Sequence, residues 1–201
     1  MTSIHTAARD GDIAELKAKL GLGVGVDAVG AMGWTALMHA ARNNQIEAVK
    51  FLIEQKAAVD QADGQQWTAL HHACSGGHVE IVALLLDSGA GLSNRSKEGR
   101  TGLVLAATNN RPSCVKLLLE RKADPTARRE DGKTLLDYAT EKNFHEIVAL
   151  LQSAGASGPS AQVAATAAST TDGNNVLAAT PLVSVCTLIH AERTRTDDNK
   201  S

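Results

Sequence analysis

A fixed step of 33 residues runs through most of this 201-residue chain. The same residue type returns at Thr2, Thr35, Thr68, Thr101 and Thr134, and a leucine or isoleucine follows each threonine by two residues. A period between about 20 and 50 residues is typical of proteins that stack one small structural unit many times. Such a stack has one long concave surface and no deep central cavity, so the period constrains function as well as fold.

The third repeat shows which elements each unit contains. Thr68 is suited to cap a helix, because its hydroxyl can accept a backbone N–H of the first turn. Leu70, Ala73 and Cys74 then recur at helical spacing and form one apolar stripe. A second helix with a wide apolar face follows and ends near Gly89, and a polar, glycine-containing stretch then predicts a hairpin. Helices this short are marginal alone in water, so their stability must come from stacking.

The turn between the two helices is predicted from a further set of in-phase residues. Glycine and asparagine are the residues that adopt a left-handed conformation most readily, and helices commonly end on one. The five in-phase positions hold only these two types: Gly11, Asn44, Gly77, Asn110 and Asn143. We therefore expect the first helix of every unit to stop there.

Three features together resemble the ankyrin repeat. They are the pattern Gly-x-Thr-x-Leu-x-x-Ala-Ala, the step of nine residues from threonine to the turn residue, and an aliphatic helix ending in Gly-Ala. The resemblance implies an all-α ankyrin repeat solenoid of five helix-turn-helix-hairpin units over residues 1–156. The units are expected at about 1–32, 33–65, 66–98, 99–131 and 132–156. The family's usual proline after the threonine is missing here, so softer helix starts are expected.

The repeat fails from Ser157 onward, and residues 157–201 form a different kind of sequence. Residues 161–171 contain only alanine, serine, threonine, glutamine and valine, a composition that rarely supports a packed core. We predict a low-complexity, disordered tail. Its apolar stretch over residues 176–190 is open to three interpretations: an interaction segment, a segment that folds back onto the fifth unit, or an extension without a role.

Partners of ankyrin repeats generally bind along the hairpin tips and the first helices. The resemblance therefore implies partner-binding positions just before each threonine and just before each turn residue. On this basis the candidate residues are Met32, Trp34, Arg42, Asn43, Gln65, Trp67, Ser75, Lys97, Arg100, Asn109, Arg128 and Lys133.

Trp34 and Trp67 stand out among these positions, because they occupy the same phase in adjacent units. Tryptophan is over-represented among residues that dominate binding energy, so the pair is a candidate anchor. The alternative is that each indole packs on the base of its own hairpin. One ring can do both with its two faces.

Charge changes along the predicted binding ridge. Basic residues gather around the last two hairpins, among them Arg95, Lys97, Arg100, Arg128, Arg129 and Lys133, with Glu98, Glu130 and Asp131 interleaved. A partner with apolar anchors at one end and acidic residues at the other would complement this ridge, and a solvated face of mixed charge is the alternative. The formal net charge of −2 and the interleaved acids argue against nucleic acid or an anionic membrane as the partner.

The sequence does not indicate a metal, cofactor or catalytic site. His71, His72, Cys74 and His78 suggest zinc, but His71 and His72 point about 100° apart on a helix, whereas zinc ligands must converge on one point. His39 and His72 share a phase and could line the concave wall, where a structural role is expected. Cys114 falls at an apolar position and is expected to be a buried thiol. With no phosphate-binding loop, nucleophile elbow or paired carboxylates, we expect no catalytic residues, cofactor or metal.

The three cysteines are separated, and the N-terminus leaves no room for a signal peptide before the repeat. We therefore expect a reducing compartment, the cytoplasm, with the nucleus as an alternative. No stretch of 18 apolar residues predicts a membrane span. The chain is interpreted as a monomeric, non-enzymatic adaptor or scaffold that binds another protein. The alternative is a stoichiometric inhibitor or regulatory subunit of an enzyme such as a kinase or protease.

Overall fold

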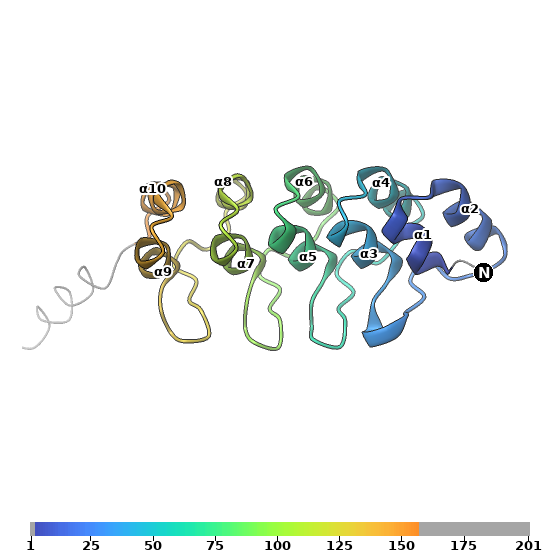
Figure 1. Ribbon diagram of the computed structural model, residues 1–201, viewed down its shortest axis with the longest axis horizontal. Coiled ribbons are helices and arrows are strands. Elements are labelled where there is room, and N and C mark those ends of the chain that lie inside the picture. Colours follow the sequence, from blue (N-terminus) through green and yellow to red (C-terminus); the bar gives the residue numbers. More distant parts are fainter. Residues whose placement is uncertain (1–2, 157–201) are drawn as a thin grey trace, which may run out of the picture.

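The computed structural model describes residues 3–156, in which ten α-helices form five consecutive pairs (Figure 1). Thr2 and the tail predicted over residues 157–201 lie outside the described residues. The helix pairs are α1 (Ile4–Asp10) with α2 (Ile13–Gly21), α3 (Ala36–Arg42) with α4 (Ile46–Glu54), α5 (Ala69–Gly76) with α6 (Val79–Asp87), α7 (Gly102–Thr108) with α8 (Pro112–Glu120), and α9 (Leu135–Glu141) with α10 (His145–Ser153). The predicted all-α solenoid is confirmed.

The first helices of the pairs begin at side-chain caps. The hydroxyls of Thr35, Thr101 and Thr134 each accept a backbone N–H three residues further on. At Thr68 the arrangement differs, because its backbone N–H donates to Nδ1 of His71 at 3.1 Å. All four threonines are buried, so these bonds satisfy polar groups that water cannot reach.

The predicted turn residues adopt the left-handed conformation in all five units. Their φ angles are 76° at Gly11, 57° at Asn44, 85° at Gly77, 53° at Asn110 and 58° at Asn143. Each first helix therefore stops where expected, and the chain reverses into the second helix. This reversal sets the two helices of a unit side by side, as their mutual packing shows.

The helices form two rows, and each row packs along the stack. Helices α1, α3, α5, α7 and α9 contact one another in that order, and so do α2, α4, α6, α8 and α10. Between the rows lies a continuous aliphatic core. One leucine position on the second helices shows its regularity: Leu52, Leu85, Leu118 and Leu151 are at most 1% exposed.

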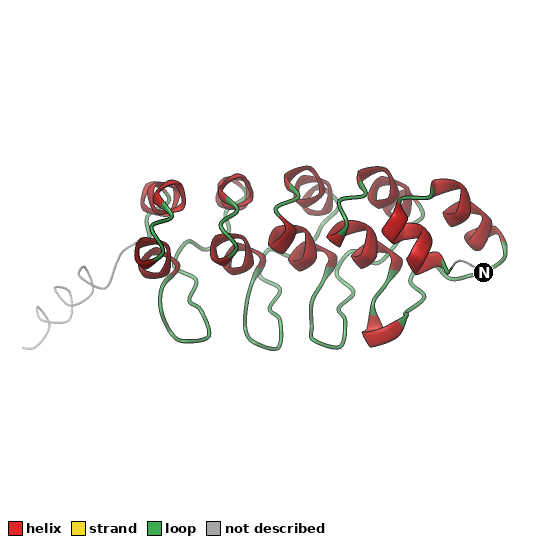
Figure 2. Cartoon of the chain, in the orientation of Figure 1, coloured by secondary structure: helices red, strands yellow, loops and turns green. Residues whose placement is uncertain are grey.

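Hairpin loops project from one side of the helix rows and lie beside one another (Figures 1 and 2). Each is closed by a backbone hydrogen bond at the same repeat position, such as Gly30 N–H to Trp34 O at 2.8 Å and Asp63 N–H to Trp67 O at 2.9 Å. Neighbouring hairpins are also joined, because Gly64 N–H donates to Met32 O at 3.0 Å. The first hairpin contains the short 3₁₀ helix η1 (Ala31–Gly33).

Candidate partner-binding groove

A row of aromatic and imidazole rings lines the inner face, by which we mean the surface formed by the hairpins and the first helices. The ring centroids of His5 and His39 are 5.7 Å apart, and those of His39 and Trp34 are 4.9 Å apart. Trp34 then lies 4.3 Å from His72, which lies 5.1 Å from Trp67. The two tryptophans predicted to share a ridge therefore flank one imidazole.

A groove of about 510 Å³ opens on this part of the inner face. Its volume is in the range of sites that bind small molecules or a few side chains of a partner. The groove joins the hairpins of three successive units. Its lining consists of Met32, Trp34, Arg42, Asp63, Gly64, Gln65, Trp67, His72, Glu98 and Arg100.

Exposed apolar side chains of the groove offer a surface that a partner could bury. Met32 is 77% exposed and has a φ of 60°, a conformation uncommon for residues other than glycine. Trp34 and Trp67 are half-buried, so each ring packs with one part and faces solvent with another. Exposed apolar atoms gathered in a hollow of this kind are typical of interaction sites.

The two arginines that line the groove are in different states. Arg100 is engaged by two carboxylates, with Nε 3.2 Å from Glu98 and Nη2 3.0 Å from Glu130. The guanidinium of Arg42 instead lies over the face of Trp34, 5.3 Å from the ring centroid. Among residues 3–156, no carboxylate forms an ion pair with Arg42, which leaves its charge available to a partner.

Asp63 and His72 form the polar floor of the groove. Their side chains are 5% and 3% exposed, and Asp63 Oδ2 lies 3.8 Å from His72 Nε2. Asp63 Oδ1 accepts the backbone N–H groups of Gln65 and Trp67 at 2.8 Å each, which orders the hairpin. Burial lowers the pKa of His72 from 6.5 to about 4, and the nearby Asp63 offsets only part of this effect. The imidazole is therefore neutral at pH 7.

The adjacent histidine, His71, has a different environment. Its Nε2–H is shared between the carbonyls of Asn94 at 3.0 Å and Arg100 at 3.1 Å, and its Nδ1 accepts from Thr68. His72 has no such partners, since neither ring nitrogen makes a hydrogen bond to any described residue. His71 thus joins its helix to the next hairpin, while His72 acts as a flat ring between two indoles.

The zinc interpretation requires His71, His72, Cys74 and His78 to converge. His71 faces the hairpin carbonyls, and His78 Nε2 donates to the Arg42 carbonyl at 3.0 Å. Cys74 is completely buried. Among residues 3–156, no group of three or more metal-binding side chains is gathered.

Six of the residues proposed from the sequence line the groove together: Met32, Trp34, Arg42, Gln65, Trp67 and Arg100. Lys97 is on the same hairpin as Arg100, and its backbone N–H donates to Gln65 O at 3.0 Å.

Several other candidates act locally at helix ends. The side-chain amides of Asn43 and Asn109 donate to the carbonyls of His39 and Leu105, each at 2.8 Å. Ser75 Oγ lies 3.4 Å from Asn109 Nδ2, so these two residues join successive units. These residues border the groove at most, and none of them lines it.

The basic C-terminal part of the ridge is largely neutralised within the chain. Lys133 Nζ lies 2.6 Å from Glu141, and Arg129 lies 3.6 Å from Asp131 and 4.0 Å from the Tyr138 ring centroid. Of the two alternatives left open by the sequence, these contacts favour a solvated face of mixed charge over an acid-binding surface at this end.

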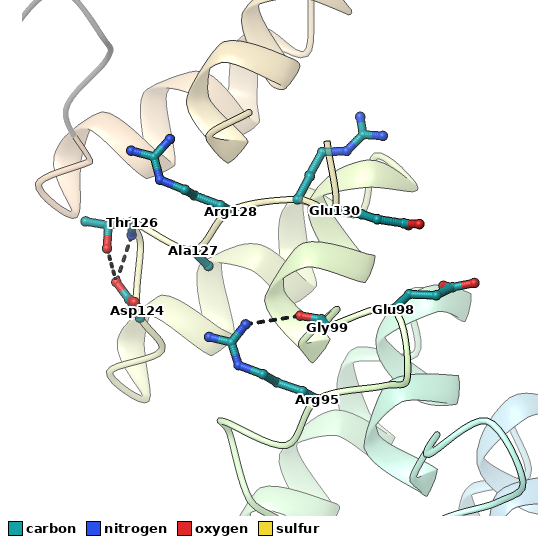
Figure 3. Close-up of a pocket in the computed structure, with 9 residues that line it drawn as sticks. Arg95, Glu98, Gly99, Asp124, Thr126, Ala127, Arg128 and Glu130 are labelled. Carbon is teal, nitrogen blue, oxygen red and sulfur yellow. Dashed lines mark hydrogen bonds between the residues drawn. The ribbon is translucent and has the colours of Figure 1, made fainter. Parts of the chain in front are cut away.

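A second, smaller hollow of about 380 Å³ lies between the last two hairpins (Figure 3). Arg95 and Arg128 occupy equivalent positions in it, and each donates through Nη1 to a glycine carbonyl, Gly99 at 3.2 Å and Gly132 at 3.0 Å. Its other walls include Glu98, Asp124 and Glu130, so its lining has no excess of one charge.

The fold and the repeated contacts agree with one family model. The model of ankyrin repeats (3 copies) matches residues 4–96 and 88–161. The chain belongs to the ankyrin repeat family. No curated protein sequence matches it significantly. Ankyrin repeats typically bind other proteins and are not enzymes, so this chain is a protein–protein interaction module. None of the helices in residues 3–156 is long and apolar enough to cross a membrane.

Asp63, Gly64 and the stacking role of His72 are the parts of this ankyrin repeat groove that the sequence did not reveal. Asp63 stands five residues before Thr68, where the other units have Gly30, Ser96 and Arg129. With no repetition at that position, the period gives no signal for it. The shared phase of His39 and His72 was such a signal, but it did not indicate that an indole from one unit contacts both rings.

Proposed function

We propose that this ankyrin repeat protein is a monomeric adaptor or scaffold that binds another protein along the groove of its inner face. The observation that supports this proposal is the pair of half-exposed indoles, Trp34 and Trp67, in one hollow beside the exposed Met32. Tryptophan is one of the residue types enriched among those that contribute most of the binding energy at protein interfaces. Function in this family depends on such surface positions and not on the fold alone.

Pull-down from cell extract tests the proposal. The bait is the full chain, and the variant combines Trp34→Ala with Trp67→Ala. The matched control is Leu22→Ala, which truncates another exposed apolar side chain, 77% exposed, outside the groove. We expect the tryptophan variant to retain its helical circular dichroism and to lose the captured partner, and the control to retain both. Equal capture by all three baits would contradict the proposal.

The adaptor role also predicts that the bound partner stays active. An adaptor holds its partner while a third component joins, so the captured complex should keep the partner's own activity or binding capacity. The partner's activity is measured with and without a stoichiometric amount of the chain. Loss of that activity would replace the adaptor with an inhibitor that uses the same groove.

A further inference from the structure

The chemistry of the groove also indicates what kind of segment it accepts. Its apolar lining, Met32 with Trp34 and Trp67, suits aliphatic or aromatic side chains. The charged groups of the lining determine which sign of charge the bound segment can carry next to those apolar side chains. Four ionisable groups of the lining bear on it: Arg42, Asp63, Glu98 and Arg100.

The indole of Trp34 is not open to a bound cation. A ligand ammonium group would need the open face of an indole, ideally within a cage of several rings. Arg42 already covers Trp34, and His72 fills the space between the two indoles, with centroids 4.3 Å from Trp34 and 5.1 Å from Trp67. At Trp34, side chains of the protein itself therefore take the positions that a bound cation would use.

The acidic groups of the groove are also engaged. The side chain of Asp63 is 5% exposed, and one of its oxygens accepts two backbone N–H groups. Glu98 lies 3.2 Å from Arg100. A basic partner would have to compete with these contacts and approach Arg42 against like charge.

Arg42 shows the opposite character. Its guanidinium is exposed at the mouth of the groove, stacked on Trp34, and forms no ion pair within the part of the chain that the structure describes. Stacking fixes the plane of a guanidinium while its N–H edges stay open, which suits paired hydrogen bonds to a carboxylate. The side chain of Lys97 is a second cation beside the groove with no ion pair among residues 3–156.

We propose that the groove binds an extended acidic segment of the partner protein, with an aspartate or glutamate on Arg42 and a neighbouring apolar side chain against Trp34 and Trp67. This inference rests on the proposed function and adds the chemistry of the partner. The carboxylate binds at the N-terminal part of the ridge, in units two and three, and not at the paired basic residues of the last hairpins.

Selection of random peptides displayed on phage, with the full chain immobilised, tests this inference without a known partner. Peptides retained by the chain but not by the Trp34→Ala, Trp67→Ala variant are sequenced. We expect them to be enriched in aspartate or glutamate within a few residues of an aliphatic or aromatic residue. Enrichment in lysine or arginine, absence of charge enrichment, or failure to select any peptide would each overturn the acidic-segment proposal.

Fluorescence then measures affinity for the most enriched peptide, made synthetically. Trp34 and Trp67 are the two tryptophans of the chain, and both line the groove, so emission reports on this site. We expect Arg42→Gln to weaken binding about ten-fold or more, because a charge-assisted hydrogen-bonded pair is lost. Arg42→Lys should recover part of the affinity. The matched control, Lys116→Gln, removes one exposed positive charge from α8 and should leave affinity unchanged.

The outcomes separate the two proposals. Selected peptides that need the tryptophans but contain no acid, or that bind Arg42→Gln as well as Lys116→Gln, overturn the acidic-segment inference and leave the adaptor proposal standing. Partner capture that is unaffected by loss of both tryptophans overturns the adaptor proposal itself.

Discussion

Trp34 and His72 belong to different repeats, yet their ring centroids are 4.3 Å apart. The indole of the second unit thus packs on the inner helix of the third, while its other neighbour, His39, lies 4.9 Å away in its own unit. The sequence alone allows two roles for this tryptophan, partner binding and packing on its own hairpin. Its contacts show a third arrangement, in which the ring joins adjacent units and still faces the groove.

Trp34→Ala should therefore cost stability as well as binding. Loss of the aromatic contacts with His39 and His72 is expected to lower the free energy of unfolding by about 1 to 2 kcal/mol. Trp34→Phe should retain much of the stabilisation, because a phenyl ring can still contact both imidazoles. Urea denaturation followed by circular dichroism measures both, and a variant as stable as the parent would show that the ring stack adds nothing.

The two adjacent histidines should respond differently to leucine. His71→Leu removes a side chain that bonds to Thr68, Asn94 and Arg100, and we expect a loss of about 2 kcal/mol. His72→Leu removes a buried ring whose nitrogens are unpaired, and Leu105 fills the same position in the next unit. Removal of the unpaired nitrogens should offset the lost ring contacts with Trp34 and Trp67, so the free energy of unfolding should change by about 1 kcal/mol or less. Equal losses for both variants in urea denaturation would contradict this difference.

Stability should fall in mild acid. The pKa of His72 is about 4 in the folded chain and 6.5 when unfolded, so between these values the unfolded state binds more protons and unfolding is favoured as the pH falls. The stabilisation is complete above pH 6.5 and is lost toward pH 4, with a magnitude of about 3 kcal/mol. Burial also lowers the pKa of His71 and His39, which adds in the same direction. Unfolding free energy measured across this range should vary less in His72→Leu than in the parent.

Truncation of the core should be far more damaging than truncation of the surface. Leu70 is 1% exposed, and Leu70→Ala is expected to cost about 2 to 5 kcal/mol through lost burial and the cavity left behind. Leu22→Ala, at a residue 77% exposed, should change stability by about 0.5 kcal/mol or less. Thermal denaturation compares the two, and similar melting temperatures would contradict the assigned core.

Cys74 and Cys114 should be unreactive while the chain is folded. Both are completely buried, and burial raises the pKa of Cys74 well above 9.0 and that of Cys114 to about 11. Thiolates are the reactive form, so a thiol reagent should modify neither at mildly alkaline pH. The test uses a variant in which the third cysteine of the sequence is replaced, Cys186→Ser, so that labelling reports on Cys74 and Cys114 alone. Reaction in concentrated urea is the positive control. Rapid labelling of the folded variant would refute this burial.

The sequence predicted the parts of the fold that repeat. Asn44, Asn110 and Asn143 were assigned to left-handed turns because they share a phase with two glycines, and their φ angles confirm it. Burial of Cys114 was likewise predicted from its phase and is confirmed. These features depend on local conformation, which a 33-residue period records directly.

Contacts that depend on how units are set against one another were not predictable in this way. The stacking of Arg42 on Trp34 follows from side-chain directions across the inner face, which no spacing encodes. The bond of Arg100 to Glu130 joins residues 30 apart, so it falls outside the 33-residue step. The number of lysine and arginine residues in the last hairpins therefore does not indicate how much positive charge is left for a partner.

Within residues 3–156, the main contacts between helix pairs run from each pair to the next, so the first and last pairs each have one neighbouring pair. The terminal pairs are expected to open first, at a small fraction of the free energy needed to unfold the middle. Trp34, Trp67 and Arg100 belong to the second, third and fourth units and are flanked by a complete unit on either side. The first or the last helix pair can therefore unfold locally while a bound partner stays in place.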